Sequence, residues 1–231
     1  MVGHLLEKLG RRVLPRGRNA RRSDNASKVK SLEQSSRDES VASAIRKPMH
    51  SDWAWRPRLW SQPIQPAAIE GVGSKTAFGD EVRVFHDCPL SEVSVSQYEA
   101  SHTEILAPFS VSLTVDRFEG SFLSLAIDLP DEAISGLTKQ HILALEASVQ
   151  AEPHLQVFAR LNVSHGPNSE KLELALLGPD PDRVAEFDMA TSQLNEARVQ
   201  RAWLDLIFEG PEKTQISLAD VTLTRRPRAP F

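Results

Sequence analysis

The feature that most constrains this chain is a strict alternation of apolar and polar residues in "FSVSLTVDRF" (109–118). In an extended strand, the apolar residues at positions 109, 111, 113 and 115 point to one side and the residues between them to the other. A helix would scatter them around its surface, because its period is 3.6 residues. The segment therefore predicts a strand with one face in a core and the other toward solvent.

The same pattern recurs in short segments separated by turn residues, from residue 75 onward. These segments are 83–86, 92–98, 109–118, 121–130, 141–150, 155–166, 171–177, 184–190, 201–209 and 214–224. Half-apolar strands in such number predict an all-β fold, a two-sheet antiparallel sandwich that is jelly-roll-like, over residues 75–229. We expect helix only as single turns, in 131–140 and 191–200.

Two local signals refine this prediction. Glu119–Gly120 predicts a hairpin between the strands on either side of it. Near the chain end, the apolar set shifts from Ile216 and Leu218 to Val221 and Leu223, which predicts a bulge near 219–220.

Charge is divided unevenly along the chain. Residues 1–60 hold 14 Lys/Arg and 6 Asp/Glu, whereas the remainder holds 13 and 25. We therefore expect a basic N-terminal arm (residues 1–47) on an acidic body. Leucines at helical spacing predict a short amphipathic helix over 2–13, and the serine-rich remainder predicts disorder.

The arm could bind an anionic partner, lie in solvent, or dock on the acidic body. The cations that would meet such a partner are Arg11, Arg12, Arg16, Arg18, Arg21 and Arg22.

Three of the four tryptophans lie in "SDWAWRPRLW" (51–60). They open a proline-containing segment, residues 48–74, which we interpret as an extended lead-in fastened to the body by aromatic anchors. Exposed tryptophans could instead form a sugar-binding platform. We favour the structural interpretation.

Binding candidates lie on the polar faces of the predicted strands and in one turn. "RLNVSHGPN" (160–168) brings Asn162, His165 and Asn168 to a strand exit, where they could bind a sugar or serve only the turn itself. Alternation predicts a polar face containing Ser124, Asp128, Glu146, Ser148, Arg160 and Asn162, with Phe122 and Phe158 among them. This face could hold a glycan or a protein, or be an ordinary solvated surface.

Other residues carry weaker hypotheses. His86 and Cys88 share a strand face and could form a thiolate–imidazole pair, although a lone cysteine is usually a small buried hydrophobe. Asp205 lies on one face with Trp203 and Ile207, and we expect it to have a partner, for example an arginine such as Arg160 or Arg198, because its burial would otherwise be costly. No spacing predicts a catalytic residue, a metal site or a cofactor.

The chain has neither a signal-peptide pattern nor an apolar run of membrane-spanning length, so we expect a soluble cytoplasmic protein.

Several segments resemble an uncharacterised alphaproteobacterial family of unknown function. They are "FEGSFLSLAIDLP" (118–130), "VFARLNVSHGPN" (157–168), "LNEARVQRAWLDLIFEGP" (194–211) and "RRPRA" (225–229). The resemblance covers residues 50–229 and implies no activity. More distantly, "ISLADVTL" is similar to the closing strand of galactose-binding-like jelly rolls, which implies a fold and not a function.

These observations leave three hypotheses. The first is a non-catalytic binding or adaptor module for a glycan or a protein, and the second is an assembly protein tethered by its arm to membrane, nucleic acid or a larger complex. A hydrolase with an unrecognised site is the third. We expect a glycan site to expose an aromatic side chain beside Asn162 or His165 in a concavity.

Overall fold

A computed structural model describes residues 45–229, except 91, 101–106, 153–154 and 180. The predicted amphipathic helix and the arginines of the arm from Arg11 to Arg22 lie outside the described residues. The boundary of the arm at residue 47 therefore stays a prediction. In the part of the chain that is described, no helix has the length and apolar character needed to cross a membrane.

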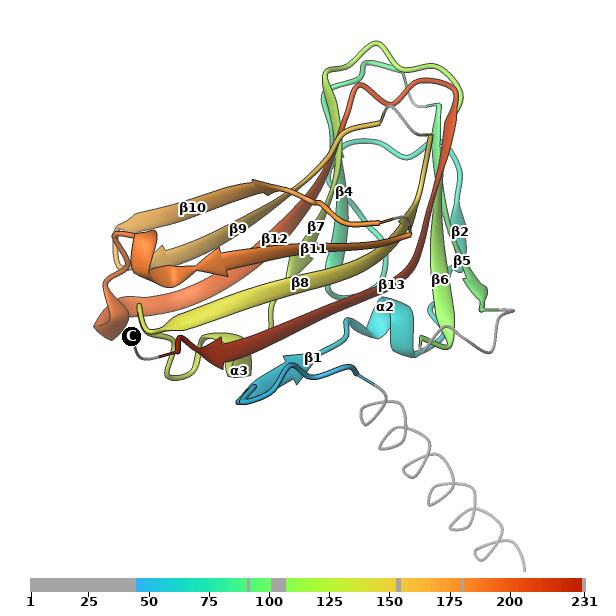
Figure 1. The fold of residues 1–231 in the computed structure, drawn as a ribbon. Helices are drawn as coiled ribbons and strands as arrows, with labels where there is room; N and C mark the ends of the chain where they lie inside the picture. Colours follow the sequence, from blue (N-terminus) through green and yellow to red (C-terminus); the bar gives the residue numbers. More distant parts are fainter. Residues whose placement is uncertain (1–44, 91, 101–106, 153–154, 180, 230–231) are drawn as a thin grey trace, which may run out of the picture. The chain divides into compact units, whose positions relative to one another are not determined.

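The fold is a two-sheet antiparallel sandwich, as the alternation predicted (Figure 1). One sheet has seven strands in the order β11-β8-β13-β6-β5-β2, with β1 also paired to β13, and the other has six in the order β10-β9-β12-β7-β4-β3. The strands are β1 (Trp53–Trp55), β2 (Ala68–Ile69), β3 (Thr76–Ala77), β4 (Val82–His86), β5 (Val93–Glu99), β6 (Phe109–Val115), β7 (Phe122–Asp128), β8 (His141–Gln150), β9 (Val157–His165), β10 (Asn168–Ala175), β11 (Asp182–Asp188), β12 (Val199–Glu209) and β13 (Thr214–Pro227).

Helix is confined to single turns among the described residues. They are α2 (Arg58–Ser61), α3 (Asp131–Ile134) and the 3-10 turns η1 (Met189–Thr191) and η2 (Glu196–Arg198). Three of them fall in or beside the segments where the sequence predicted isolated turns.

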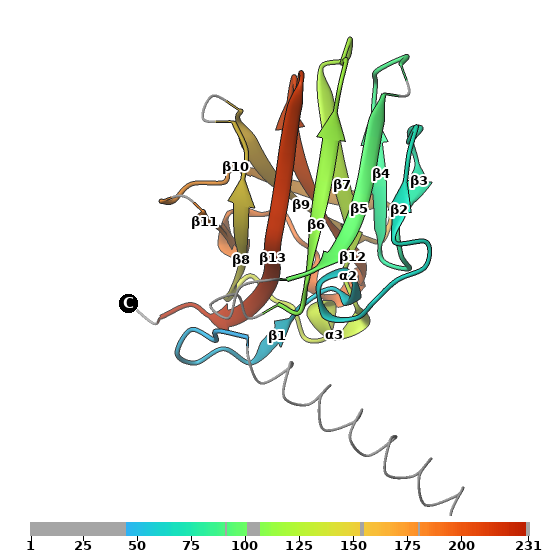
Figure 2. The ribbon, with the colours of Figure 1, turned by 90° about the vertical axis from the view of Figure 1, so that its right-hand side faces the viewer.

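The core lies between the two sheets and is built from the inner residue of each alternating pair. Leu113 of β6 and Leu145 of β8 enter it from the seven-stranded sheet, and Leu125 of β7 and Leu204 of β12 enter from the other. All four are fully buried. Figure 2 shows β8, β13, β6 and β5 side by side as one layer.

The predicted hairpin at Glu119–Gly120 is wrong. β6 pairs with β5 and β13, whereas β7 pairs with β4 and β12, so the chain crosses from one sheet to the other between them. Asp87, which follows β4, holds this crossover: its carboxylate accepts hydrogen bonds from Ser121 N (2.8 Å), Ser121 Oγ (2.6 Å) and Phe122 N (3.2 Å). Alternation cannot distinguish a hairpin from a crossover, because both keep the apolar residues inward.

The predicted bulge in the last strand is confirmed. The register between β13 and β8 shifts between Leu218 and Asp220, and the apolar residues on both sides of the shift are buried. The bulge presents Asp220 to Arg56, which bonds both carboxylate oxygens at 2.8 and 2.7 Å. The extra residue thus keeps the strand face in the core and ties β13 to the lead-in.

The tryptophans of the lead-in pack on the sandwich. Trp60 of α2 is fully buried, and its indole N–H donates to the Leu218 carbonyl at 3.0 Å. Trp53 and Trp55 are half-buried, stack with ring centroids 6.3 Å apart, and lie on β1, which pairs with β13. Trp60 is thus a buried anchor, as the structural interpretation expected, and Trp53 and Trp55 are partly buried rings that pack against the core.

Candidate functional site

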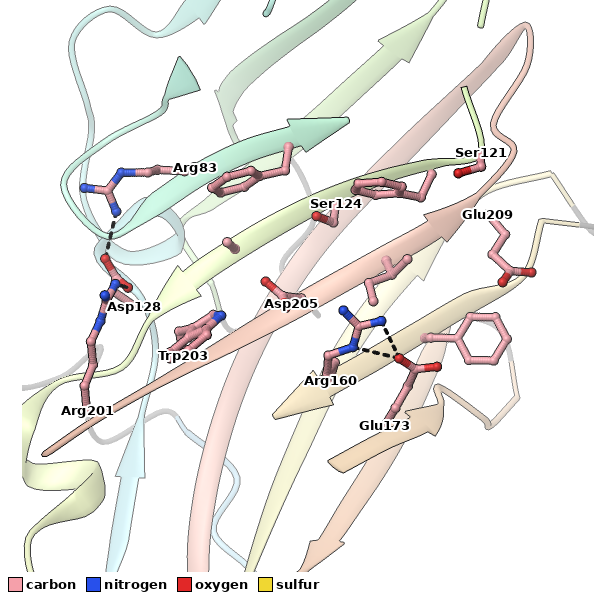
Figure 3. Close-up of a pocket in the computed structure, with 15 residues that line it drawn as sticks. Arg83, Ser121, Ser124, Asp128, Arg160, Glu173, Arg201, Trp203, Asp205 and Glu209 are labelled. Carbon is pink, nitrogen blue, oxygen red and sulfur yellow. Dashed lines mark hydrogen bonds and ion pairs between the residues drawn. The ribbon is translucent and has the colours of Figure 1, made fainter. Parts of the chain in front are cut away.

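The outer face of the six-stranded sheet is hollowed into a groove with a volume of about 810 Å³ (Figure 3). Side chains from five strands line it, because alternate residues of each strand point away from the core. The residues that define the groove are Arg83, Phe85, Ser121, Phe122, Ser124, Ala126, Asp128, Phe158, Arg160, Glu173, Arg201, Trp203, Asp205, Ile207 and Glu209.

Small residues on β7 open the floor of the groove. Ala126 lies in register between Arg83 of β4 and Asp205 of β12, and Ser124 occupies the same place in the next row. Because neighbouring strands are about 4.8 Å apart, the flanking backbones are separated by about 10 Å. The larger side chains of β4 and β12 therefore form the two walls of the groove, and the small residues of β7 form its floor.

Four aromatic side chains line the groove, each from a different strand. They are Phe85 of β4, Phe122 of β7, Phe158 of β9 and Trp203 of β12, and all four are half-buried. The guanidinium carbon of Arg201 lies 5.3 Å from the centroid of the Trp203 ring, a cation–π contact. The rings remain accessible from the groove while the strands beneath hold their backbones in place.

One carboxylate at the side of the groove is held by two arginines. Arg83 Nη1 donates to Asp128 Oδ2 at 2.8 Å, and Arg201 Nη2 donates to Asp128 Oδ1. Burial works in the opposite direction, but the hydrogen bonds and charges of Arg201 and Arg83 keep the pKa of Asp128 below its usual value. Asp128 is therefore ionised and joins β4, β7 and β12.

A second ion pair lies on the other side. Arg160 of β9 bonds Glu173 of β10, with its Nε and Nη2 at 2.7 and 2.6 Å from Oε2. This pairing joins the guanidinium to the edge strand β10, while its charge still acts on Asp205 of β12.

Asp205 lies in the middle of the groove, and Figure 3 shows it between Trp203 and Arg160. Its Oδ2 accepts a hydrogen bond of 2.9 Å from Asn162 Nδ2, and it forms no ion pair with any described residue. Burial raises the pKa of Asp205 despite the bond from Asn162 and the charges of Arg160 and Lys171. Asp205 therefore has a partner, as expected, but the partner is the amide of Asn162 and not Arg160 or Arg198.

Of the seven binding residues predicted from the sequence, the structure brings Phe122, Asp128, Phe158 and Arg160 together in the groove. Asn162 lies beneath it, with only 2% of its surface exposed. His165 faces the interior and accepts a hydrogen bond from Asn195 N at 3.2 Å. Asn168 is exposed where β10 begins. The turn cluster of Asn162, His165 and Asn168 is therefore not one site.

The predicted polar face is also divided. Glu146 and Ser148 lie on β8 of the seven-stranded sheet, and so they face away from the groove. Their alternation was identified correctly, but alternation does not say which sheet a strand joins.

Trp203, Arg83 and Phe85 belong to the groove but were not among the predicted binding residues. The alternation in "RAWLDLIFE" could have identified Trp203. Leu204 and Leu206 occupy the alternate positions and are fully buried, so Trp203 faces the opposite, outer side of the strand. Trp203 lies in register with Asn162 of β9. Trp203 therefore lines the groove directly above the buried Asn162.

His86 and Cys88 do not form the thiolate–imidazole pair that was the less favoured alternative, and Cys88 is buried, as the favoured interpretation expected. His86 Nε2 lies 3.0 Å from the Val72 carbonyl oxygen, and Cys88 Sγ accepts a hydrogen bond from Glu119 N at 3.3 Å. Both side chains are buried. Across the described ranges, no group of three or more His, Cys, Asp and Glu side chains is placed to hold a metal ion.

Comparison with known proteins gives a family and a set of similar folds. The model of the family described as "Family of unknown function (DUF6478)" matches residues 9–231. No curated protein matches the chain.

Similar solved structures include a family 30 carbohydrate-binding module, with 8% identity and a TM-score of 0.46 over 79% of this chain and 92% of that one. A family 11 carbohydrate-binding module from Clostridium thermocellum has 8% identity and a TM-score of 0.42 over 68% and 95% of the two chains. The enzymatically active domain of Bacteriophage CBA120 tailspike protein 4 also has 8% identity and a TM-score of 0.42, over 62% of this chain. This chain spans only 19% of that protein's length.

Proposed function

The chain belongs to DUF6478, a family of unknown function. Because membership of this family implies no activity, we propose from the geometry of the groove that the protein is a non-catalytic glycan-binding module. The observation that carries the proposal is the combination of four half-buried aromatic rings with fixed polar groups in one open groove. Sugar rings present apolar C–H faces and hydroxyl edges, so a carbohydrate chain can use both kinds of surface at once.

The groove is suited to such a ligand in size and in rigidity. A volume of about 810 Å³ lies within the range of roughly 300–1,000 Å³ that is usual for ligand sites. Its side chains stand on hydrogen-bonded strands, and three of its charged residues are fixed in ion pairs around Asp128. Little conformational entropy is then lost when a ligand binds.

The arrangement of carboxylates favours binding without cleavage. Asp128 and Glu173 are each held by arginine, which leaves Asp205 and Glu209 as the groove carboxylates without an ion pair. These two lie four residues apart on β12, or about 13 Å along a strand. Glycosidases place their two carboxyl groups roughly 5–10 Å apart. The hydrolase hypothesis therefore gains no support from this groove.

Binding of the full-length protein to a glycan array, followed by isothermal titration calorimetry with the best oligosaccharide, tests the proposal. We expect Trp203→Ala and Phe158→Ala each to weaken binding about tenfold or more, which corresponds to about 1.4 kcal/mol. Tyr98→Ala is the matched control, because Tyr98 is an exposed aromatic residue on β5 of the other sheet. Absence of glycan binding, or binding that both groove variants leave unchanged, contradicts the proposal.

The alternative function, tethering by the basic arm, rests on residues 1–47, of which 1–44 lie outside the described part of the chain. It stays a prediction, and removal of these residues tests it. Loss of a partner with glycan binding retained would assign the two activities to different parts of the chain.

A further inference from the structure

The charged side chains of the groove do not all neutralise one another. Each of its three arginines bonds a carboxylate: Arg83 and Arg201 share Asp128, and Arg160 bonds Glu173. Asp205 forms no ion pair with a described residue. The groove therefore holds an unpaired negative charge at its centre, while its positive charges are already engaged.

Local geometry fixes this carboxylate and leaves it open to a ligand. Asn162 is almost completely buried and holds Oδ2, whereas Oδ1 has no hydrogen-bond partner among the described residues. The residue directly across on β7 is Ala126, whose small side chain leaves room over Asp205. A donor entering the groove can reach the free oxygen without displacing a protein group.

The surroundings of Asp205 favour a cationic donor over a neutral one. Trp203 precedes it by two residues on the same strand face, and aromatic rings attract cations through their negative faces. The contact of Arg201 with Trp203 shows that this ring already receives one cation. Arg160 and Lys171 act on Asp205 through their charges, but neither bonds it directly. A hydroxyl group would add only a hydrogen bond, whereas an ammonium group would add both a hydrogen bond and a positive charge in contact with the carboxylate.

We infer that Asp205 binds an unsubstituted amino group of the ligand, so that the groove selects glycans containing free amino sugars over neutral or N-acetylated ones. This inference rests on the proposed function and names the substrate class for the same site. An acidic sugar is disfavoured, because it would have to draw an arginine away from Asp128 or Glu173.

The test compares three oligosaccharides of equal length by calorimetry with the full-length protein. They are a β-1,4-linked glucosamine tetrasaccharide, its fully N-acetylated counterpart and a neutral β-1,4-linked glucose tetrasaccharide. We expect the glucosamine compound to bind at least tenfold more tightly than the other two, and added salt to reduce this preference.

Asp205→Asn removes the charge but keeps an oxygen that can accept the Asn162 bond, so the variant preserves the fold. It should bind all three compounds with affinities within about threefold of one another. Asp182→Asn is the control, because it neutralises an exposed carboxylate on β11 of the other sheet and should keep the preference.

The outcomes separate this inference from the proposed function. Equal binding of the three compounds by the native protein, lost in Trp203→Ala, overturns the amino-group inference while supporting a glycan site. A preference for glucosamine that survives in Asp205→Asn also overturns it. Binding of none of the three, together with a negative glycan array, contradicts both.

Discussion

Asn162 of β9 donates a hydrogen bond of 2.9 Å to Asp205 of β12, although the residue directly across from Asp205 in register is Arg160. Arg160 instead bonds Glu173 on the opposite side, at 2.7 Å. Because β9 lies between β10 and β12, the side chain of Arg160 can reach either strand, and it bonds the carboxylate of Glu173 on the edge strand β10. Asp205 is thereby left half-buried, held by an amide and ionised at a cost.

This cost predicts that Asp205→Asn stabilises the protein at neutral pH. Burial raises the pKa of Asp205 in the folded state, so the penalty on the folded form grows as the pH rises above the unfolded-state pKa and is complete above the folded-state pKa. Below the unfolded value of about 3.9 the residue is protonated in both states and the penalty disappears. Thermal unfolding should therefore show a higher Tm for the variant at pH 7 and a difference that shrinks toward pH 4. A lower Tm for the variant at pH 7 would contradict this reasoning.

Asp128 should behave in the opposite way. Arg201 and Arg83 outweigh burial and lower its pKa, so its contribution to stability is present above about pH 4 and is lost as the pH falls through the folded-state pKa. Because all three side chains are partly exposed, we expect Asp128→Asn to cost only about 0.5–1 kcal/mol at pH 7. Urea unfolding at pH 7 and at low pH measures this effect.

The control for Asp128 is Asp80→Asn, which removes the exposed pair between Arg58 and Asp80 at 3.4 Å. This pair should contribute less than about 0.5 kcal/mol. Equal losses in the two variants would show that the double pairing of Asp128 adds nothing.

Trp60 should be the tryptophan on which stability depends most. It is fully buried, and its N–H bonds Leu218, so Trp60→Ala leaves a large cavity and an unpaired carbonyl, at a cost of about 3–5 kcal/mol. Urea unfolding of Trp60→Ala beside Trp203→Ala measures the contrast, because Trp203 lines the open groove. A larger loss for Trp203→Ala would reverse the roles assigned to the two rings.

Gly120 lies in the crossover between the sheets and cannot accept a side chain without movement of the backbone. A Cβ there would lie 2.4 Å from Asp87 Oδ1 and 2.8 Å from Cys88 N. We expect Gly120→Ala to destabilise the protein by about 1–3 kcal/mol, measured by thermal unfolding. Gly73→Ala is the matched control, because no atom lies within 4 Å of its added Cβ. Similar Tm values for the two variants would argue against a tight crossover.

The predictable part of the fold follows from local pattern. The alternation in 109–118 and 201–209 identified strands and their inner faces, and the change of phase between Leu218 and Val221 identified a bulge. Each signal is contained in neighbouring residues, because successive side chains of a strand point in opposite directions. Five groove residues were found in this way, as members of an outward polar face: Phe122, Ser124, Asp128, Phe158 and Arg160.

The remaining features of the fold depend on which strands pair over long distances in the sequence, and local pattern does not predict this. The sequence placed Glu146 and Arg160 on one polar face, yet β8 and β9 belong to different sheets. It predicted a hairpin at Glu119–Gly120, where the chain instead changes sheet. In both cases the local pattern is compatible with either arrangement.

The sequence by itself determined that this protein is built from strands and which side of each strand enters the core, since both depend on a period of two residues. Only the tertiary structure decided that Arg83, Asp128, Trp203 and Asp205 meet in one groove. Residues more than 100 positions apart, such as Arg83 and Asp205, come together only through the order of strands in the sheet. That order is set by how the whole core packs, and not by the residues that line the groove.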